Sequence, residues 1–228
     1  MIQQITPHNR SMAILRIYKG ILSLITGLLL LNPNETSAQV TFAEDMLQHH
    51  QIPLHTFQGF YQLPNKVAFI SFEQQDDSLY ATQLWDQKKY QLIRTGETSF
   101  ASKNEGYTIA FLKDSMGNFT QAKILGRIVC QRILFNPSKV VKLSLSQLNT
   151  LAGTYLMAND NNLKIKIEPS EQGLLLTQLW DNKTIAFTPR SEFFFLNEDA
   201  TFPLTFSFAN GKVKQMQCFE NDLWLKAD

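Results

Sequence analysis

The chain has 228 residues and a formal net charge of +1, with 44% hydrophobic and 18% charged residues. This composition is that of a globular protein, large enough for one β domain or two small ones, and it excludes a disordered or coiled-coil chain. The near-neutral charge argues against a nucleic-acid binder, and two cysteines are too few for a disulfide scaffold.

The N-terminal segment has the pattern of a secretory signal peptide. Basic residues precede an apolar run at 21–31, and small residues follow at 36–38. We expect residues 1–38 to be removed, with translation starting at Met1 or Met12 and export from a bacterium to the periplasm or the medium. The alternative is an uncleaved membrane anchor, but the run is shorter than the roughly 20 residues of a spanning helix, so no membrane span is expected after cleavage.

Residues 39–54 lead into the folded part. Thr41 and Glu44 have the spacing of a capping box, and Pro53 ends the pattern, which predicts a short helix at 41–50.

Three histidines, His49, His50 and His55, gather at this lead-in beside Glu44 and Asp45. They match metal ligands in type but not in spacing, because neighbouring residues of a helix point in different directions. No cysteine pair or H-E-x-x-H motif completes a site. We therefore expect a solvated surface with no bound metal and no other cofactor.

An internal repeat organises the rest of the chain. The pentamer TQLWD at 82–86 recurs at 177–181, an offset of 95 residues, and Gly-x-Tyr at 59–61 recurs at 153–155, an offset of 94. This period is far longer than the roughly 20–50 residues of solenoid repeats, so it indicates a domain-scale duplication. The predicted parts are copy 1 at 55–134, a linker at 135–148 and copy 2 at 149–228.

Both copies are rich in strand patterns. Leu163, Ile165 and Ile167 alternate with polar residues, which predicts a half-buried strand. Copy 2 has a similar inward set at Phe202, Leu204, Phe206 and Phe208. Copy 1 has two such sets, one at Ala68, Ile70 and Phe72 and one at Tyr107, Ile109 and Phe111. The runs of copy 2 are 153–157, 162–168, 173–180, 184–188, 192–196, 201–208, 212–218 and 222–226.

Three local signals refine this pattern. Pro203 interrupts the hydrogen-bond ladder of its strand, which suits an edge or an irregular pairing. Asn210 and Gly211 lie between two runs and predict a type I′ hairpin. Residues 146–148 are expected to start a helical turn before copy 2.

The predicted fold is all-β. Eight short runs with tight, regular turns predict an antiparallel meander in each copy. Such a meander can close into a barrel, which leaves no exposed edge, and the alternative is a pair of twisted open sheets packed together. We therefore expect two tandem eight-stranded antiparallel meander barrels behind a short N-terminal helix.

Copy 2 resembles a known family. Its motifs are L-x-x-L-x-G-x-Y at 148–155, P-x-S-E-x-F-F at 189–195, and F-x-F and N-G-K-V between 206 and 213. Together they are similar to the small lipocalin-like (calycin-type) β domain often found after serine hydrolases of the β-lactamase-like superfamily in secreted bacterial proteins. Copy 1 matches more weakly, since Arg94-Thr95-Gly96-Glu97 replaces the P-x-S-E motif. No S-x-x-K or G-x-S-x-G nucleophile motif occurs in residues 39–228.

The resemblance implies one structural device. In calycin barrels an aromatic residue follows a glycine on the first strand, and a basic residue on the last strand packs over it and closes one end. Tyr61 with Arg132, and Tyr155 with Lys226, are similar in position. Lysine makes the second pair a weaker match, because a planar guanidinium stacks better than an ammonium group.

The repeated pentamer supplies the candidate ligand site. Gln83 and Trp85 share a strand face by the period-two rule, as do Gln178 and Trp180. Each tryptophan could stack on a ligand while the glutamine orients it by hydrogen bonds. The competing interpretation is that Trp85 and Trp180 fill the barrel cores, and the narrowness of an eight-stranded barrel favours it.

Recurrent carboxylates raise the possibility of acid–base catalysis, as in glycoside hydrolysis. Glu97 and Glu192 recur, as do Asp86 and Asp181, but no histidine or nucleophile accompanies them. We expect the aspartates to cap hairpin turns, and Ser191 to cap a turn rather than act as a nucleophile. No catalytic residue and no enzymatic activity is predicted.

The two cysteines are expected to be free. Cys130 falls on the last strand of copy 1, whereas Cys218 falls in copy 2 on the inward face that also holds Met216. A bond between two separate domains would be geometrically awkward. Both thiols should act as small buried hydrophobes.

The functional hypothesis is an exported, non-catalytic binding module for a small apolar ligand or a secreted protein partner. The alternative is a structural accessory pair that docks onto a separately encoded secreted hydrolase. A hydrolase using the recurrent carboxylates ranks third.

Overall fold

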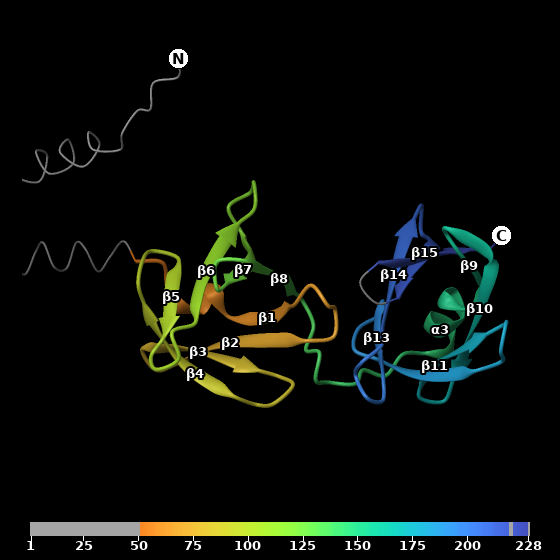
Figure 1. Ribbon diagram of the computed structural model, residues 1–228, viewed down its shortest axis with the longest axis horizontal. Coiled ribbons are helices and arrows are strands. Elements are labelled where there is room, and N and C mark those ends of the chain that lie inside the picture. Colours follow the sequence, from red (N-terminus) through yellow and green to blue (C-terminus); the bar gives the residue numbers. More distant parts are fainter. Residues whose placement is uncertain (1–50, 219–220, 228) are drawn as a thin grey trace, which may run out of the picture. The chain divides into compact units, whose positions relative to one another are not determined.

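The computed structural model describes residues 51–218 and 221–227, and it shows two closed antiparallel barrels (Figure 1). In each barrel the strands follow one another in chain order. Closure comes from pairing of the first and last strands, β1 with β8 and β9 with β16. The predicted all-β architecture of two tandem eight-stranded meander barrels is confirmed, and the alternative of open packed sheets is wrong.

Barrel 1 follows a short 3-10 helix, η2 (Leu54–Phe57). Its strands are β1 (Gly59–Gln62), β2 (Phe69–Gln75), β3 (Ser78–Gln83), β4 (Lys89–Arg94), β5 (Ser99–Ser102), β6 (Thr108–Lys113), β7 (Phe119–Ile124) and β8 (Ile128–Ile133).

Barrel 2 follows the helix α3 (Leu145–Leu151). Its strands are β9 (Gly153–Met157), β10 (Asp160–Ser170), β11 (Gly173–Gln178), β12 (Thr184–Pro189), β13 (Phe194–Asn197), β14 (Pro203–Ala209), β15 (Lys212–Cys218) and β16 (Asp222–Lys226). Helix α3 begins at a capping box, in which the Ser144 hydroxyl accepts from the Gln147 backbone N–H and the Gln147 side chain accepts in return. The helical turn expected at 146–148 is therefore part of α3.

The cores follow the predicted alternation closely. The inward residues of four strands, Ile70, Phe72, Ile109, Phe111, Ile165, Ile167, Leu204 and Phe206, are all buried. Four further members of the predicted inward sets, Ala68, Tyr107, Leu163 and Phe202, are only partly buried. Three of these four precede the first residue of their strand, so they lie at the margin of the core.

Phe208 departs from the predicted inward set. The β14–β15 ladder shifts register between Ser207 and Phe208. The extra residue lies on β15, so Phe208 still pairs directly with buried Val213. The Phe208 side chain lies near the end of β14, where it is 38% exposed and packs against Phe193, with ring centroids 4.7 Å apart.

Pro203 is not on an edge, because a closed barrel has none. It is the first residue of β14, it is buried, and it pairs with Leu196 of β13. Proline is tolerated at the start of a strand. The hairpin predicted at Asn210 and Gly211 is confirmed: both residues have positive φ, 52° and 74°, as a type I′ turn requires.

Both cysteines are free and buried, as predicted. Burial raises the pKa of the Cys130 thiol to about 11 and raises that of the Cys218 thiol as well. The thiols therefore stay protonated and pack as apolar groups at neutral pH.

The expected signal peptide at 1–38 and the expected helix at 41–50 lie outside the described residues. Within the described part of the chain, no helix combines the length and the apolar character that crossing a membrane requires.

Candidate functional site

One end of each barrel is closed by the segment that precedes its first strand. In barrel 1, η2 places Phe57 in the core, where its ring stacks on Phe111 with centroids 4.6 Å apart. In barrel 2, α3 contacts β10 and β15 and buries Leu148 and Leu151 (Figure 1). Phe57 and Leu151 are equivalent in the repeat, so the same end is plugged in both barrels.

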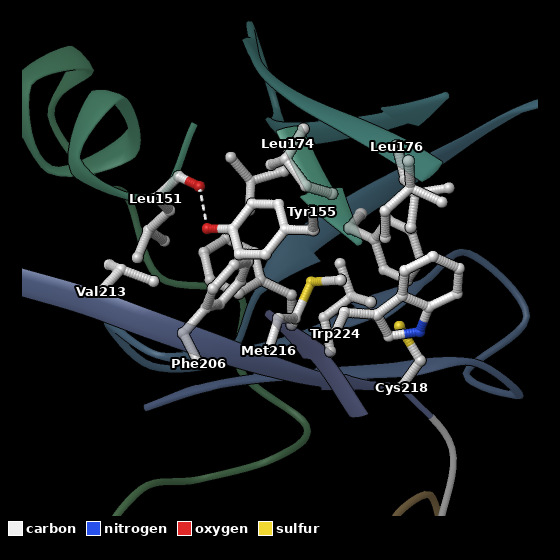
Figure 2. Close-up of a cluster of buried hydrophobic side chains, with 14 of the residues drawn as sticks. Leu151, Tyr155, Leu174, Leu176, Phe206, Val213, Met216, Cys218 and Trp224 are labelled. Atoms are coloured by element: carbon white, nitrogen blue, oxygen red, sulfur yellow. Dashed lines mark hydrogen bonds between the residues drawn. The ribbon is translucent and has the colours of Figure 1, made fainter. Parts of the chain in front are cut away.

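The repeated tyrosines tie these plugs to the barrels. Tyr61 and Tyr155 are fully buried. The Tyr61 hydroxyl donates to the Phe57 carbonyl at 3.3 Å, and the Tyr155 hydroxyl donates to the Leu151 carbonyl at 2.6 Å (Figure 2). Burial raises the pKa of Tyr61 to about 12 and also raises that of Tyr155, so both remain donors across the physiological pH range.

The basic residue of each pair lies beside its tyrosine on the last strand. Arg132 pairs in register with Tyr61, and its guanidinium donates to the carbonyls of Gln58 at 2.5 Å and Phe119 at 3.2 Å. Lys226 pairs with Tyr155 and donates to the Thr150 carbonyl at 3.0 Å, with its Nζ 5.9 Å from the ring centroid. Arg132 thus donates hydrogen bonds to several backbone carbonyls, whereas Lys226 donates to one.

Arg94 also closes barrel 1, a role that no pattern in the sequence indicates. Its guanidinium lies 4.9 Å from the Phe100 ring centroid and 5.6 Å from that of Phe57, and it donates to the Ile52 carbonyl at 2.7 Å. Burial lowers the pKa of Arg94. The equivalent position of copy 2 is Pro189, so no repeated motif marked this residue.

The opposite end of each barrel is formed by the turn that contains the repeated pentamer. In barrel 1, the Asp86 carboxylate accepts from the Lys88 backbone N–H at 3.1 Å, and Gln87 adopts positive φ. In barrel 2, Asp181 and Lys183 make the same bond at 3.1 Å. The predicted turn-capping role of both aspartates is therefore confirmed.

This turn, and not a strand, carries the tryptophans. Strands β3 and β11 end at Gln83 and Gln178, so Trp85 and Trp180 follow in the turns. Trp85 is 51% exposed and Trp180 is 46% exposed. The interpretation that these two residues fill the barrel cores is wrong, because the chain has already left the barrel wall when it reaches them.

Gln83 and Trp85 line a cavity of about 200 Å³ at the open end of barrel 1. Its walls are almost entirely apolar. Its polar side chains include Gln83 and Ser102, whose hydroxyl accepts from the Tyr107 backbone N–H at 2.9 Å. The remaining lining residues are Leu63, Ile70, Phe72, Ala81, Tyr90, Leu92, Tyr107, Ile109, Ile124, Leu125 and Ile128.

Gln178 and Trp180 line the corresponding cavity of barrel 2, about 220 Å³ in volume. Trp224 lies in its wall, nearly parallel to Trp180, with ring centroids 6.3 Å apart and an interplanar angle of 12°. The other lining residues are Met157, Leu163, Ile165, Leu176, Phe202, Cys218 and Asp222.

Two substitutions between the copies make the cavities different. Trp224 of barrel 2 corresponds to Cys130 of barrel 1, and Leu176 corresponds to Ala81. Larger side chains occupy these two positions in barrel 2. The barrel 1 cavity reaches Phe72 and Leu92 in the core, whereas the barrel 2 cavity is lined by two tryptophans.

The remaining candidate residues do not converge. Glu97 is exposed, and Glu192 is exposed and accepts from the Gln147 side chain at 2.8 Å. The Ser191 hydroxyl accepts from the Phe194 backbone N–H at 3.1 Å, which confirms its role in a turn.

The predicted histidine surface is described only at His55, which is exposed. His49, His50, Glu44 and Asp45 lie outside the described residues. Over residues 51–218 and 221–227, no group of three histidine, cysteine or acidic side chains is arranged to hold a metal ion.

Comparison with models of known protein families found no match for this chain, and a search of curated proteins found none either. The structure itself shows two eight-stranded antiparallel closed barrels, an architecture consistent with a lipocalin-like fold.

Proposed function

We propose that the protein is an exported, non-catalytic binding module, and that barrel 1 takes a small apolar ligand through its open end. The observation that carries this proposal is the apolar cavity beside Trp85, which lies opposite the end plugged by Phe57 and Arg132. A barrel closed at one end and hollow at the other offers a dry pocket with one entrance. Such pockets, lined by apolar side chains with a few polar groups, are the usual form of small-molecule sites.

The volume of the cavity limits the ligand. An engineered apolar cavity of about 150 Å³ is large enough to bind benzene. The cavity of about 200 Å³ therefore suits a single aromatic ring or a short branched hydrocarbon. The lining is almost entirely apolar and has few side chains that can form hydrogen bonds, so the ligand carries few hydrogen-bonding groups.

The proposed origin of the protein is the duplication of a lipocalin-like (calycin-type) domain. The plugged end, the glycine and tyrosine of the first strand, and the basic residue of the last strand recur in both barrels, and they support this relationship. A non-catalytic role is supported by the present partners of the recurrent carboxylates. Asp86 and Asp181 cap turns, and Glu192 binds Gln147.

Titration with toluene tests the proposal. The chain has three tryptophans, so a ¹H–¹⁵N spectrum of the protein shows three indole cross-peaks, and Trp85 reports on barrel 1 alone. We expect saturable movement of the Trp85 cross-peak. Ala81→Leu, which introduces the residue that barrel 2 carries at this position, should weaken binding at least tenfold. A Trp85 cross-peak that stays in place up to millimolar toluene would refute the proposal.

The second candidate function is docking onto a separately encoded secreted hydrolase. It is favoured by large apolar side chains that are exposed in the chain segment joining β8 to β9: Leu134 is 99% exposed, Leu145 65% and Val140 52%. Co-elution with a secreted β-lactamase-like hydrolase from the same genome would support docking if Leu134→Ser abolished it and Ala81→Leu did not.

A further inference from the structure

Barrel 2 contains a buried hydrogen-bond donor without a partner. The Trp224 side chain is 6% exposed, and its Nε1 atom makes no hydrogen bond within the described residues. Buried polar side-chain atoms almost always have a partner in folded proteins. An unsatisfied indole N–H therefore requires an explanation, and binding of an acceptor supplied by a ligand is one such explanation.

The donor lies in the wall of the barrel 2 cavity. Trp224, Trp180 and Gln178 all line this space of about 220 Å³. Figure 2 shows the Trp224 indole at the margin of the barrel 2 core, beside Cys218 and away from the Tyr155 end. The open end of barrel 2 thus combines a free donor with exposed aromatic surface on Trp180.

The orientation of the two rings suits a flat ligand. An indole N–H donates in the plane of its ring, and the hydrogen bond leaves rotation about its axis free, so a flat acceptor ring bound end-on can lie coplanar with Trp224. Because the planes of Trp180 and Trp224 differ by only 12°, the same ligand ring would lie nearly parallel to Trp180. Offset parallel packing is a favoured aromatic geometry.

The charge at the cavity restricts the ligand further. Asp222 is one of the lining residues, and its negative charge disfavours an anionic ligand by repulsion. We propose that the open end of barrel 2 is a second binding site, separate from the barrel 1 cavity, for a small uncharged planar ring that carries a nitrogen or carbonyl acceptor. Trp224 Nε1 donates to that acceptor, and Trp180 packs against the ring.

Barrel 1 has no equivalent of this donor. Cys130 stands where barrel 2 has Trp224, and the cavity beside Trp85 is lined mainly by aliphatic and phenyl side chains. The two barrels therefore select different ligands, an apolar one in barrel 1 and an acceptor-bearing ring in barrel 2.

Quinoline and naphthalene form a matched pair of probes, because they have the same shape and only quinoline has a ring nitrogen. In a ¹H–¹⁵N titration of the protein, quinoline should move the Trp180 and Trp224 indole cross-peaks, and the Trp224 proton should shift downfield as it forms the hydrogen bond. Naphthalene should bind barrel 2 about tenfold more weakly, since it leaves the donor unsatisfied.

Trp224→Phe removes the donor and keeps an aromatic ring. It should weaken quinoline binding at the Trp180 cross-peak about tenfold and leave naphthalene binding nearly unchanged. Trp85→Phe is the matched control, because it makes the same change at the open end of barrel 1. That variant should not alter binding at the Trp180 cross-peak.

Equal affinity of quinoline and naphthalene for the wild-type protein would overturn the proposal without the need for any variant. Equal loss of both probes in Trp224→Phe would also overturn it, since that result indicates lost packing alone. Movement confined to the Trp85 cross-peak would place quinoline in barrel 1, which would support the first proposed site and reject the second.

Discussion

Arg132 lies directly over the α-carbon of Gly59. A β-carbon at Gly59 would sit 3.1 Å from the Arg132 Nε atom, and the φ of this glycine is +135°, in the region that side chains rarely adopt. The arginine reaches the Gln58 carbonyl only because it can cross this bare stretch of backbone. The glycine that opens the repeat therefore has a defined role in closing the barrel.

Gly59→Ala should consequently lower the free energy of unfolding by about 2–3 kcal/mol, from backbone strain together with displacement of Arg132. Urea denaturation measures this change. Gly117→Ala is the control, since a β-carbon there meets open space and only the positive φ of 86° opposes it, so its cost should be about 1 kcal/mol. Equal losses in the two variants would show that contact with Arg132 contributes nothing.

The two basic residues at the closed ends should differ in their contribution to stability. Arg132→Met leaves the Gln58 and Phe119 carbonyls without this donor and should lower the free energy of unfolding by about 1–3 kcal/mol. Lys226→Met removes a single hydrogen bond to Thr150 and should cost about 1 kcal/mol or less. Chemical denaturation of both variants ranks them, and a larger loss for Lys226→Met would contradict this account.

The exchange of Ala81 and Leu176 between the barrels should have opposite effects on stability. Ala81→Leu fills part of the barrel 1 cavity, so the free energy of unfolding should stay the same or rise by about 1 kcal/mol. Leu176 is buried, so Leu176→Ala creates a void in the core of barrel 2 and should lower the free energy of unfolding by about 2–5 kcal/mol. Thermal and urea unfolding of both variants test this pair. A strong loss of stability in Ala81→Leu would mean that the cavity does not accommodate the larger side chain.

Alkaline pH should destabilise the protein. Burial raises the pKa of Cys130 from 9.0 to about 11 and that of Tyr61 from 10.0 to about 12. Between those values the unfolded chain has lost the proton while the folded protein keeps it, so stability falls as pH rises, by up to about 1.4 kcal/mol per pH unit for each group.

Urea denaturation from pH 8 to pH 12 should therefore show a decline that begins near pH 9. In Cys130→Ala the part of the decline between pH 9 and 11 should become shallower, because the thiol no longer titrates. A slope identical to that of the wild-type protein would show that Cys130 does not contribute.

Much of the architecture could be predicted from local pattern. The 95-residue repeat, the alternation in strands such as Ile165–Ile167, and the Asn210–Gly211 turn depend on interactions within or between neighbouring strands. A meander is built almost entirely from such neighbours. For the same reason, the turn-capping aspartates could be anticipated from their places in the repeat. The position of Tyr61 beside Arg132 was implied by the resemblance to calycin barrels.

The open ends could not be predicted in this way. Whether Trp85 fills a core or forms a rim depends on where β3 leaves the barrel wall, and a difference of two residues at the strand end decides it. Likewise, Phe208 continues the alternation of its strand and pairs with buried Val213, yet its side chain is exposed because it lies near the strand end, outside the core.

The amino-acid sequence by itself determined the duplication, the order of the strands and the capped turns, because these follow from periodicity and local turn chemistry. Only the tertiary structure decided that Ala81 and Cys130 leave space in one barrel while Leu176 and Trp224 occupy it in the other. A cavity depends on the sum of side-chain volumes contributed by strands far apart in the chain, and on which buried donors lack a partner there. Both become visible only when all eight strands are in place.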